Sequence, residues 1–496
     1  MKKVLVWWPM LTPDLVDELE NNGYQIVAAI QTDCSRVRCF SLQQVFDTDG
    51  VRGPCFDDRS AKLFQSSFNK YLRNLSRLHL VKPVAAGLSA EMHTFEAVPY
   101  RYDEACNLFF MHYERLKDIL KDLAVEAVWF ARPPHLGLDN LLFDLCKTIG
   151  IQTLVFQQSL FPSRFFFGTS VDSLFEHGAD KLFNNDVTLE DVTNPNLFYM
   201  RPQSRRNALG RDFYEKFRSR MVRGSLPAAV ARKVANMLHD RRYFFCAALA
   251  KYFFHYSVPL LLREMANAHS AREYYKVAAE IDALKEKLPD NFVYFALHLQ
   301  PEATTSEFGG TFQDQANAID ALESVLPDGW KILVKENPKQ GYLYRGQKFY
   351  ERLSANPSVR FVPRDTSSAS LVQRARLTAT ITGTVGYEAL VAGKPVIIFG
   401  NAWYKSVPGA CTFAPNMDLA AISRVRVDAL EVRDEFHRIQ TRCADGVIYR
   451  SYSVLSARSK RDLAARTANS IARIDAALYP RASVAGSSRK YSHDRP

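Results

Sequence analysis

The chain of 496 residues lacks the signatures of a disulfide-stapled, metal-ribbon or membrane-spanning protein. None of its eight cysteines forms a CxxC pair, so no zinc ribbon or thioredoxin-type motif is predicted. The N-terminal apolar run is interrupted by Pro9 and Pro13, and we expect a first β-strand there rather than a secretory signal. The most apolar later stretch, residues 243–262, contains Lys251 and His255, so we predict no spanning helix.

The overall composition is that of a globular protein with two or three domains. Hydrophobic residues make up 47% and charged residues 24%. Sixty-four Lys and Arg against fifty-three Asp and Glu give a net charge of +11, which favours an anionic partner such as a nucleotide, an acidic sugar or an acidic lipid. No recognised nucleic-acid motif is present, so we expect no nucleic-acid partner. Scattered thiols fit a reducing cytosol, and a cytoplasmic location is expected.

Alternating strand-like and helix-like segments predict an α/β fold with two Rossmann-like domains. The first spans residues 1–200 and the second residues 290–450, with a basic helical inter-domain segment at 201–289. Strands rich in Val and Ile, apolar on both faces, indicate parallel sheets that face each other across a cleft. A helix at 451–480 and a disordered tail at 481–496 complete the prediction.

A glycine turn between a strand and a helix is the most informative motif. Its two glycines let the backbone approach a ligand closely, and the helix that begins near the second glycine offers N–H groups to an anion. A carboxylate in the first turn can accept hydrogen bonds from ribose hydroxyls. The predicted nucleotide-binding residues are Thr382, Gly383, Thr384, Gly386 and Glu388. An ordinary strand–turn–helix, with the carboxylate favoured by the helix dipole, is the alternative.

Two other strand ends of the second domain carry polar residues. One strand ends in His298, Gln300 and Glu302, and strand alternation places the first two on one face. We predict catalytic roles for His298 and Glu302 and ligand binding for Gln300, although a lone histidine is often structural. Lys335 and Asn337 follow the next strand and can meet a phosphate or a carboxylate; a surface Lys–Glu pair is the alternative.

The first domain supplies a second catalytic candidate pair, His135 and Asp139, directly after a strand. The two side chains can act as a general base with its orienting carboxylate, or Asp139 can be a nucleophile. Asp139 can equally be the N-cap of the helix that follows. These readings stay open at the level of the sequence.

The order of the motifs LHLQPEATT, LVKENP and TGTVGYEALVAGKPVIIFG resembles the bacterial capsule and surface-polysaccharide biosynthesis family, which includes β-Kdo (3-deoxy-manno-octulosonate) glycosyltransferases. A helix with Asp314 and Gln315 lies between the first two motifs, and PPHLGLDNLL and QQSLFPSRFF resemble the family's N-terminal half. The resemblance covers residues 125–165 and 290–405. Relatives often carry His-Pro where this chain has Asn337-Pro338, and an Asn can donate a hydrogen bond but carries no charge.

The resemblance implies a GT-B fold and transfer of a sugar, Kdo, from the CMP-activated donor CMP-Kdo to a glycan or a lipid-linked glycan. It places the donor in the second domain and the acceptor in the first. No convincing DxD pair is present, and we expect no metal and no further cofactor. A CDP-alcohol phosphotransferase, a UDP-sugar epimerase and a non-catalytic capsule assembly or export factor remain alternatives.

A peripheral attachment to the inner membrane is a further expectation. Residues 205–251 combine arginines and lysines with interleaved aromatic residues. Each basic residue near an anionic leaflet contributes about 1 kcal/mol, and aromatic rings suit the interface. The alternative is that the aromatic side chains pack against the two domains and the arginines are solvated.

Overall fold

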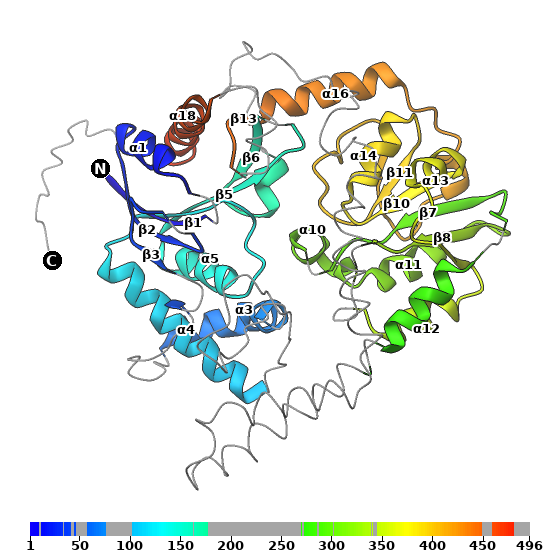
Figure 1. Ribbon diagram of the computed structural model, residues 1–496, viewed down its shortest axis with the longest axis horizontal. Coiled ribbons are helices and arrows are strands. Elements are labelled where there is room, and N and C mark those ends of the chain that lie inside the picture. Colours follow the sequence, from blue (N-terminus) through cyan, green and yellow to red (C-terminus); the bar gives the residue numbers. More distant parts are fainter. Residues whose placement is uncertain are drawn as a thin grey trace, which may run out of the picture.

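The computed structural model has two α/β domains that lie side by side, each built on its own sheet (Figure 1). The structure describes residues 1–8, 11–32, 34–40, 44–45, 57–75, 102–161, 163–176, 269, 272–284, 287–300, 302–338, 340, 345–448 and 459–480. The predicted α/β class with parallel-stranded Rossmann-like sheets is confirmed.

The first sheet has the strand order β13-β6-β5-β4-β1-β2-β3 in the described part of the chain. Strands β5, β4, β1, β2 and β3 are parallel, whereas β6 and β13 are antiparallel additions at one edge that the sequence did not predict. The bounds are β1 Lys2–Trp7, β2 Tyr24–Ile30, β3 Cys39–Phe40, β4 Ala127–Phe130, β5 Gln152–Gln158, β6 Arg164–Gly168 and β13 Ala444–Asp445.

Helices cover both faces of this sheet. The first of them, α1, begins after Thr12, whose hydroxyl accepts from the N–H of Leu15, and Pro13 occupies the first helical position. Apolar residues on both sheet faces form two separate clusters, as expected for buried parallel strands. The helix bounds are α1 Pro13–Asn21, α3 Asp58–Leu75, α4 Tyr102–Asp122, α5 Leu138–Ile149 and the 3-10 helix η1 Asp172–Phe175.

The second sheet is parallel throughout, in the order β12-β11-β10-β7-β8-β9. The strand order reverses beside β7, which lies between β8 and β10 although it comes first in the chain. Open parallel sheets bind ligands beyond the carboxyl ends of the strands at such a reversal. The bounds are β7 Phe292–Ala296, β8 Lys331–Lys335, β9 Val359–Val362, β10 Leu377–Thr380, β11 Val396–Ile398 and β12 Ala410–Thr412.

The helices of the second domain follow its strands in the predicted alternation, with shorter bounds than the sequence indicated. A helical segment, residues 272–282, precedes β7. Its Tyr274 packs against Tyr350 of the second domain. The bounds are α10 Ala303–Ser306, η5 Gly310–Gln313, α11 Gln315–Glu323, α12 Gln347–Ser354, α13 Ser368–Arg374, α14 Thr384–Val391, α15 Leu419–Ile422 and α16 Ala429–Arg442.

The chain returns to the first domain near its end. After α16, strand β13 pairs with β6 of the first sheet, and α18 (Lys460–Leu478) lies beside α1 (Figure 1). Lys2 Nζ forms a 2.6 Å ion pair with Asp475 of α18. Residues 444–445 therefore belong to the first sheet, whereas the sequence analysis placed the end of the second domain at residue 450.

Side chains join the two domains directly. The ring of Trp403, in the loop after β11, packs against Phe166 of β6, and Lys405 of the same loop forms an ion pair with Glu176. Lys70 of α3 pairs with Glu307 of the second domain at 3.0 Å. These contacts bring the first sheet's edge close to the loops that follow the second sheet's strands.

Several expectations concern residues outside the described part of the chain. They include most of the basic inter-domain segment, the residues 205–251 considered for membrane attachment, and the tail 481–496. Within the described residues, no helix is long and apolar enough to cross a membrane.

Candidate functional site

The glycine turn lies at the reversal point of the second sheet, directly after β10. Gly383 is the N-cap of α14, and its N–H donates to Thr380 Oγ1 at 3.1 Å. Helix α14 begins at Thr384, two residues earlier than the sequence indicated. Within the described structure, no protein group accepts from the backbone N–H of Thr384 or Val385. The helix N-terminus therefore presents two N–H donors to an anion.

Both glycines of the turn are required by close contacts. A Cβ on Gly383 would lie 2.9 Å from His298 Nε2, and one on Gly386 would lie 2.2 Å from the hydroxyl oxygen of Tyr404. That hydroxyl donates to Gly383 O. Tyr404 thus holds the turn by a hydrogen bond to its backbone, and the absence of a Cβ on Gly386 makes room for the Tyr404 ring.

His298 lies under the turn and is uncharged. Its Nε2 is 2.8 Å from Thr380 Oγ1, the same hydroxyl that accepts from the N–H of Gly383. Burial, with a smaller contribution from the nearby Arg345 cation, lowers the pKa of His298 to about 3. The ring can therefore hold the turn by hydrogen bonding but adds no positive charge for a leaving phosphate.

Strand β7 ends at Ala296, so His298 and Gln300 lie beyond the strand and not on one strand face as predicted. Gln300 Nε2 donates to Gln313 O at 2.5 Å, so its side-chain amide forms a hydrogen bond within the protein. The exposed Glu302 precedes α10, and its carbonyl accepts from the N–H groups of Thr305 and Ser306. Its side chain accepts from the Thr304 hydroxyl at 3.2 Å.

Thr382 also acts within the protein. Its hydroxyl donates to Thr304 O at 2.7 Å and so ties the glycine turn to the loop that follows β7. Thr384 and Glu388 are half-buried on the first turns of α14. Of the two predicted threonine donors, Thr382 is thus occupied within the protein, whereas Thr384 is the first residue of α14.

Lys335, the last residue of β8, is buried and 4% exposed. Its Nζ donates to Ser368 Oγ at 2.8 Å. Burial lowers its pKa to about 8, against the smaller opposing effects of the Glu388 and Asp365 carboxylates. At neutral pH the ammonium is therefore a buried positive charge at the sheet's carboxyl edge.

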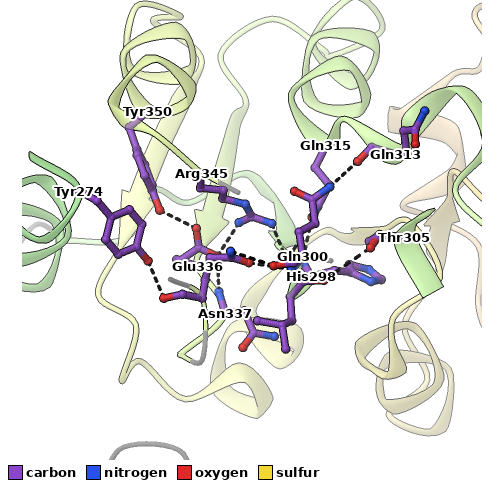
Figure 2. Close-up of polar contacts among 12 residues, drawn as sticks. Tyr274, His298, Gln300, Thr305, Gln313, Gln315, Glu336, Asn337, Arg345 and Tyr350 are labelled. Carbon is purple, nitrogen blue, oxygen red and sulfur yellow. Dashed lines mark hydrogen bonds and ion pairs between the residues drawn. The ribbon is translucent and has the colours of Figure 1, made fainter. Parts of the chain in front are cut away.

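The residue after Lys335 forms a buried ion pair that the sequence did not reveal (Figure 2). Glu336 pairs with Arg345, and both side chains are almost fully buried. Glu336 also accepts from the Tyr350 hydroxyl at 2.7 Å and from the N–H of Asn337 at 2.6 Å. The alternative of a surface Lys335–Glu336 pair is therefore wrong.

The candidate pair of the first domain is not assembled as predicted. Asp139 is the second residue of α5, whose N-cap is Gly137, and its carboxylate accepts from the backbone N–H of His135 and Leu136 at 3.0 and 2.6 Å. Burial raises the Asp139 pKa, while these backbone hydrogen bonds lower it. Asp139 thus organises the loop, so it neither orients the His135 ring nor presents a free nucleophile.

The His135 ring has a defined tautomer. Its Nδ1 lies 2.7 Å from Pro133 O, and because a carbonyl can only accept, Nδ1 carries the proton. Nε2 is then the nitrogen that can receive a proton. Among the described residues, no hydrogen bond or ion pair links His135 to the second-domain residues.

The structure thus brings together His298, Thr382, Gly383, Thr384 and Gly386 around the turn, with Lys335 and Glu388 beside it. Sequence reasoning missed Tyr404, Arg345, Gln340 and Gln315 as supporting residues, because none directly follows a strand. The one available signal was the position of Gln315 in a helix that the family motifs include.

A comparison with known families finds one match. Residues 215–412 match the family described as capsule polysaccharide biosynthesis protein. The matched segment holds strands β7, β8, β9, β10, β11 and β12 and the glycine turn. The match confirms the resemblance seen in the motifs of residues 290–405 and extends it toward the N-terminus. No curated protein sequence matches the chain.

The solved structures that match the chain include two β-Kdo transferase structures and an epimerase. The β-Kdo 2,4 transferase of Thermosulfurimonas dismutans KpsC is 20% identical over 30% of this chain and 45% of its own, with a TM-score of 0.21. The β-Kdo 2,7 transferase of the same protein is 10% identical over 66% and 89%, with a TM-score of 0.28. The UDP-GlcNAc 2-epimerase of Methanocaldococcus jannaschii, solved with UDP-GlcNAc and UDP, is 10% identical over 89% and 99%, with a TM-score of 0.25. The chain thus spans less than half of the first of these structures.

Proposed function

We propose that the chain is a glycosyltransferase of surface-polysaccharide biosynthesis that transfers Kdo from CMP-Kdo to a glycan or a lipid-linked glycan. The observation that carries the proposal is the N-terminus of α14, which lies at the reversal point of the second sheet, within the residues that match the capsule polysaccharide family. Capsule synthesis builds a polymer from activated sugars, and a nucleotide-sugar donor carries the phosphate that such a helix end binds.

In this proposal the donor phosphate accepts hydrogen bonds from the Thr384 and Val385 N–H groups. The Lys335 ammonium adds positive charge at the same sheet edge, and Glu388 accepts from ribose hydroxyls. As the sugar leaves, negative charge develops on the phosphate, and donors fixed in advance stabilise it without reorganisation. The resemblance to Kdo transferases supports a CMP-activated acidic sugar as the donor.

The acceptor belongs to the first domain in this proposal. His135, with its proton on Nδ1, can take the acceptor hydroxyl proton on Nε2. Asp139 is not proposed again as nucleophile or orienting carboxylate, since the backbone occupies its oxygens. Glu302 is an exposed carboxylate two residues before Thr304, whose carbonyl accepts from the Thr382 hydroxyl of the glycine turn.

The test of the proposed function is a product assay. The protein is incubated with CMP-Kdo and a membrane-extracted glycolipid, and the glycolipid is analysed by mass spectrometry. Addition of one Kdo residue supports the proposal. A thermal-shift panel with CMP, CDP and UDP distinguishes the alternatives: CDP selectivity favours the alcohol phosphotransferase, UDP selectivity the epimerase, and no response to any of them the non-catalytic factor.

Replacing Thr384 or Glu388 by Ala is expected to weaken CMP binding by about tenfold, because each change removes one hydrogen-bonding group from the ligand side of α14. Both side chains are half-buried, so the melting temperature without ligand should change little. Calorimetric titration with CMP measures the effect. Parental affinity in both variants would show that the turn has a purely structural role.

A further inference from the structure

The loop after β7 has an unusual set of backbone partners (Figure 2). The N–H of His298 donates to Gln315 Oε1 at 2.7 Å, and Gln315 Nε2 donates back to His298 O at 3.3 Å. Two residues later, the N–H of Gln300 donates to Gln340 Oε1 at 2.8 Å, and Gln340 Nε2 donates to Gln300 O at 3.2 Å. Each glutamine amide therefore pairs with both backbone groups of one loop residue.

The two amides come from separate elements and are both buried. Gln315 is the first residue of α11, and Gln340 lies in the loop after β8; they are 0% and 1% exposed. A buried amide is costly unless its polar atoms are bonded, and so are the N–H and C=O of a loop that has left its sheet. Here the buried amides and the backbone groups of the loop satisfy one another's hydrogen bonds, and the loop keeps one defined conformation.

This loop is connected to the glycine turn at two points. The His298 ring reaches Thr380 Oγ1, which accepts from the N–H of Gly383. Farther along, Thr304 O accepts from the Thr382 hydroxyl. Arg345 also holds the loop itself, since its Nη2 donates to the same His298 carbonyl that Gln315 contacts. A displacement of His298 would therefore be transmitted to the N-cap of α14.

We infer that Gln315 and Gln340 are positioning residues for the ligand site. They touch no ligand themselves; they hold the loop so that His298 supports the turn and the Thr384 and Val385 N–H groups keep a fixed direction. The inference rests on the proposed function for the nature of the ligand, a nucleotide phosphate. It assigns a role to the glutamine-containing helix that the family motifs include.

The test uses the full chain and the variants Gln315→Met and Gln340→Met, which keep the side-chain length and remove both hydrogen bonds. Gln347→Met is the matched control, because Gln347 is exposed on α12 and its amide donates to the Glu351 carboxylate at 2.7 Å. Two quantities are measured on folded protein, well below its melting temperature: the Kd for CMP, and hydrogen–deuterium exchange of the unliganded chain. If Gln315→Met does not fold, Gln315→Asn takes its place.

The expected result is a rise in the Kd for CMP of about tenfold in both variants, with faster exchange confined to residues 297–306 and 380–386. Unchanged exchange in those segments overturns the inference, as does parental CMP affinity despite faster exchange. Faster exchange spread over the whole second domain would show a general structural role and also overturn it. If the parent binds none of CMP, CDP and UDP, the proposed function fails, and exchange alone decides the positioning role.

Discussion

Replacing Arg345 by Met is expected to lower the free energy of unfolding of the second domain by about 3–5 kcal/mol, because removal of one partner leaves a buried charge unpaired. Arg345 is fully buried, and Glu336, its partner, is 2% exposed. The same substitution removes a hydrogen bond to His298 O. Urea unfolding followed by tryptophan fluorescence measures the loss.

Two comparisons make this prediction specific. Arg352→Met removes ion pairs with Asp314 and Asp320 that lie at the surface, and should cost less than about 1 kcal/mol. The double variant Glu336→Gln with Arg345→Met removes both charges and should regain part of the loss. Equal effects of Arg345→Met and Arg352→Met would contradict the buried pair.

Replacing Lys335 by Met is expected to weaken CMP binding while making the unliganded protein more stable. At pH 7 the buried ammonium is charged, and burial lowers its pKa to about 8 from an ordinary value of 10.5. The folded state therefore holds this charge at a cost, and its removal should raise the free energy of unfolding by about 1–3 kcal/mol at pH 7. Loss of the charge should weaken CMP binding by about tenfold or more.

The pH dependence has a definite sign. Between about pH 8 and pH 10.5 the unfolded chain binds more protons at Lys335 than the folded chain does, so parental stability rises with pH in this window. The stability advantage of Lys335→Met should shrink over the same window. Parental CMP affinity should fall as pH rises through 8. A variant as stable as the parent at pH 7 would show that the Lys335 charge is not costly. A variant that binds CMP like the parent would show that the charge does not act on the ligand.

The central parallel strands of both domains and the position of the glycine turn after one of them could be predicted from the sequence. Runs such as VLVWW and PVIIFG are apolar on both faces, and the residues after such strands lie at the sheet edge where ligands bind. The predicted strand was too long, however, because β7 ends at Ala296, before His298 and Gln300. The loop beyond β7 is held by glutamine amides instead of a neighbouring strand.

The roles of individual polar residues could not be read from spacing. Arg345 lies far from any strand end, and only the folded chain shows that it neutralises Glu336 inside the domain. Asp139 has the position of a catalytic carboxylate, but its oxygens are occupied by the backbone of the preceding loop. Strand β13 escaped prediction because two residues carry no periodic pattern and their partner β6 lies far away in the sequence.

Photoaffinity labelling with a photoreactive CMP analogue tests the central claim most directly. The labelled protein is digested, and the modified peptides are identified by mass spectrometry, with excess CMP as the competitor. Binding at the end of α14 predicts competed labels within residues 297–306 and 382–388. Labels on the first domain alone, for instance within residues 131–140, or labels that excess CMP does not remove, would contradict a nucleotide site at the glycine turn.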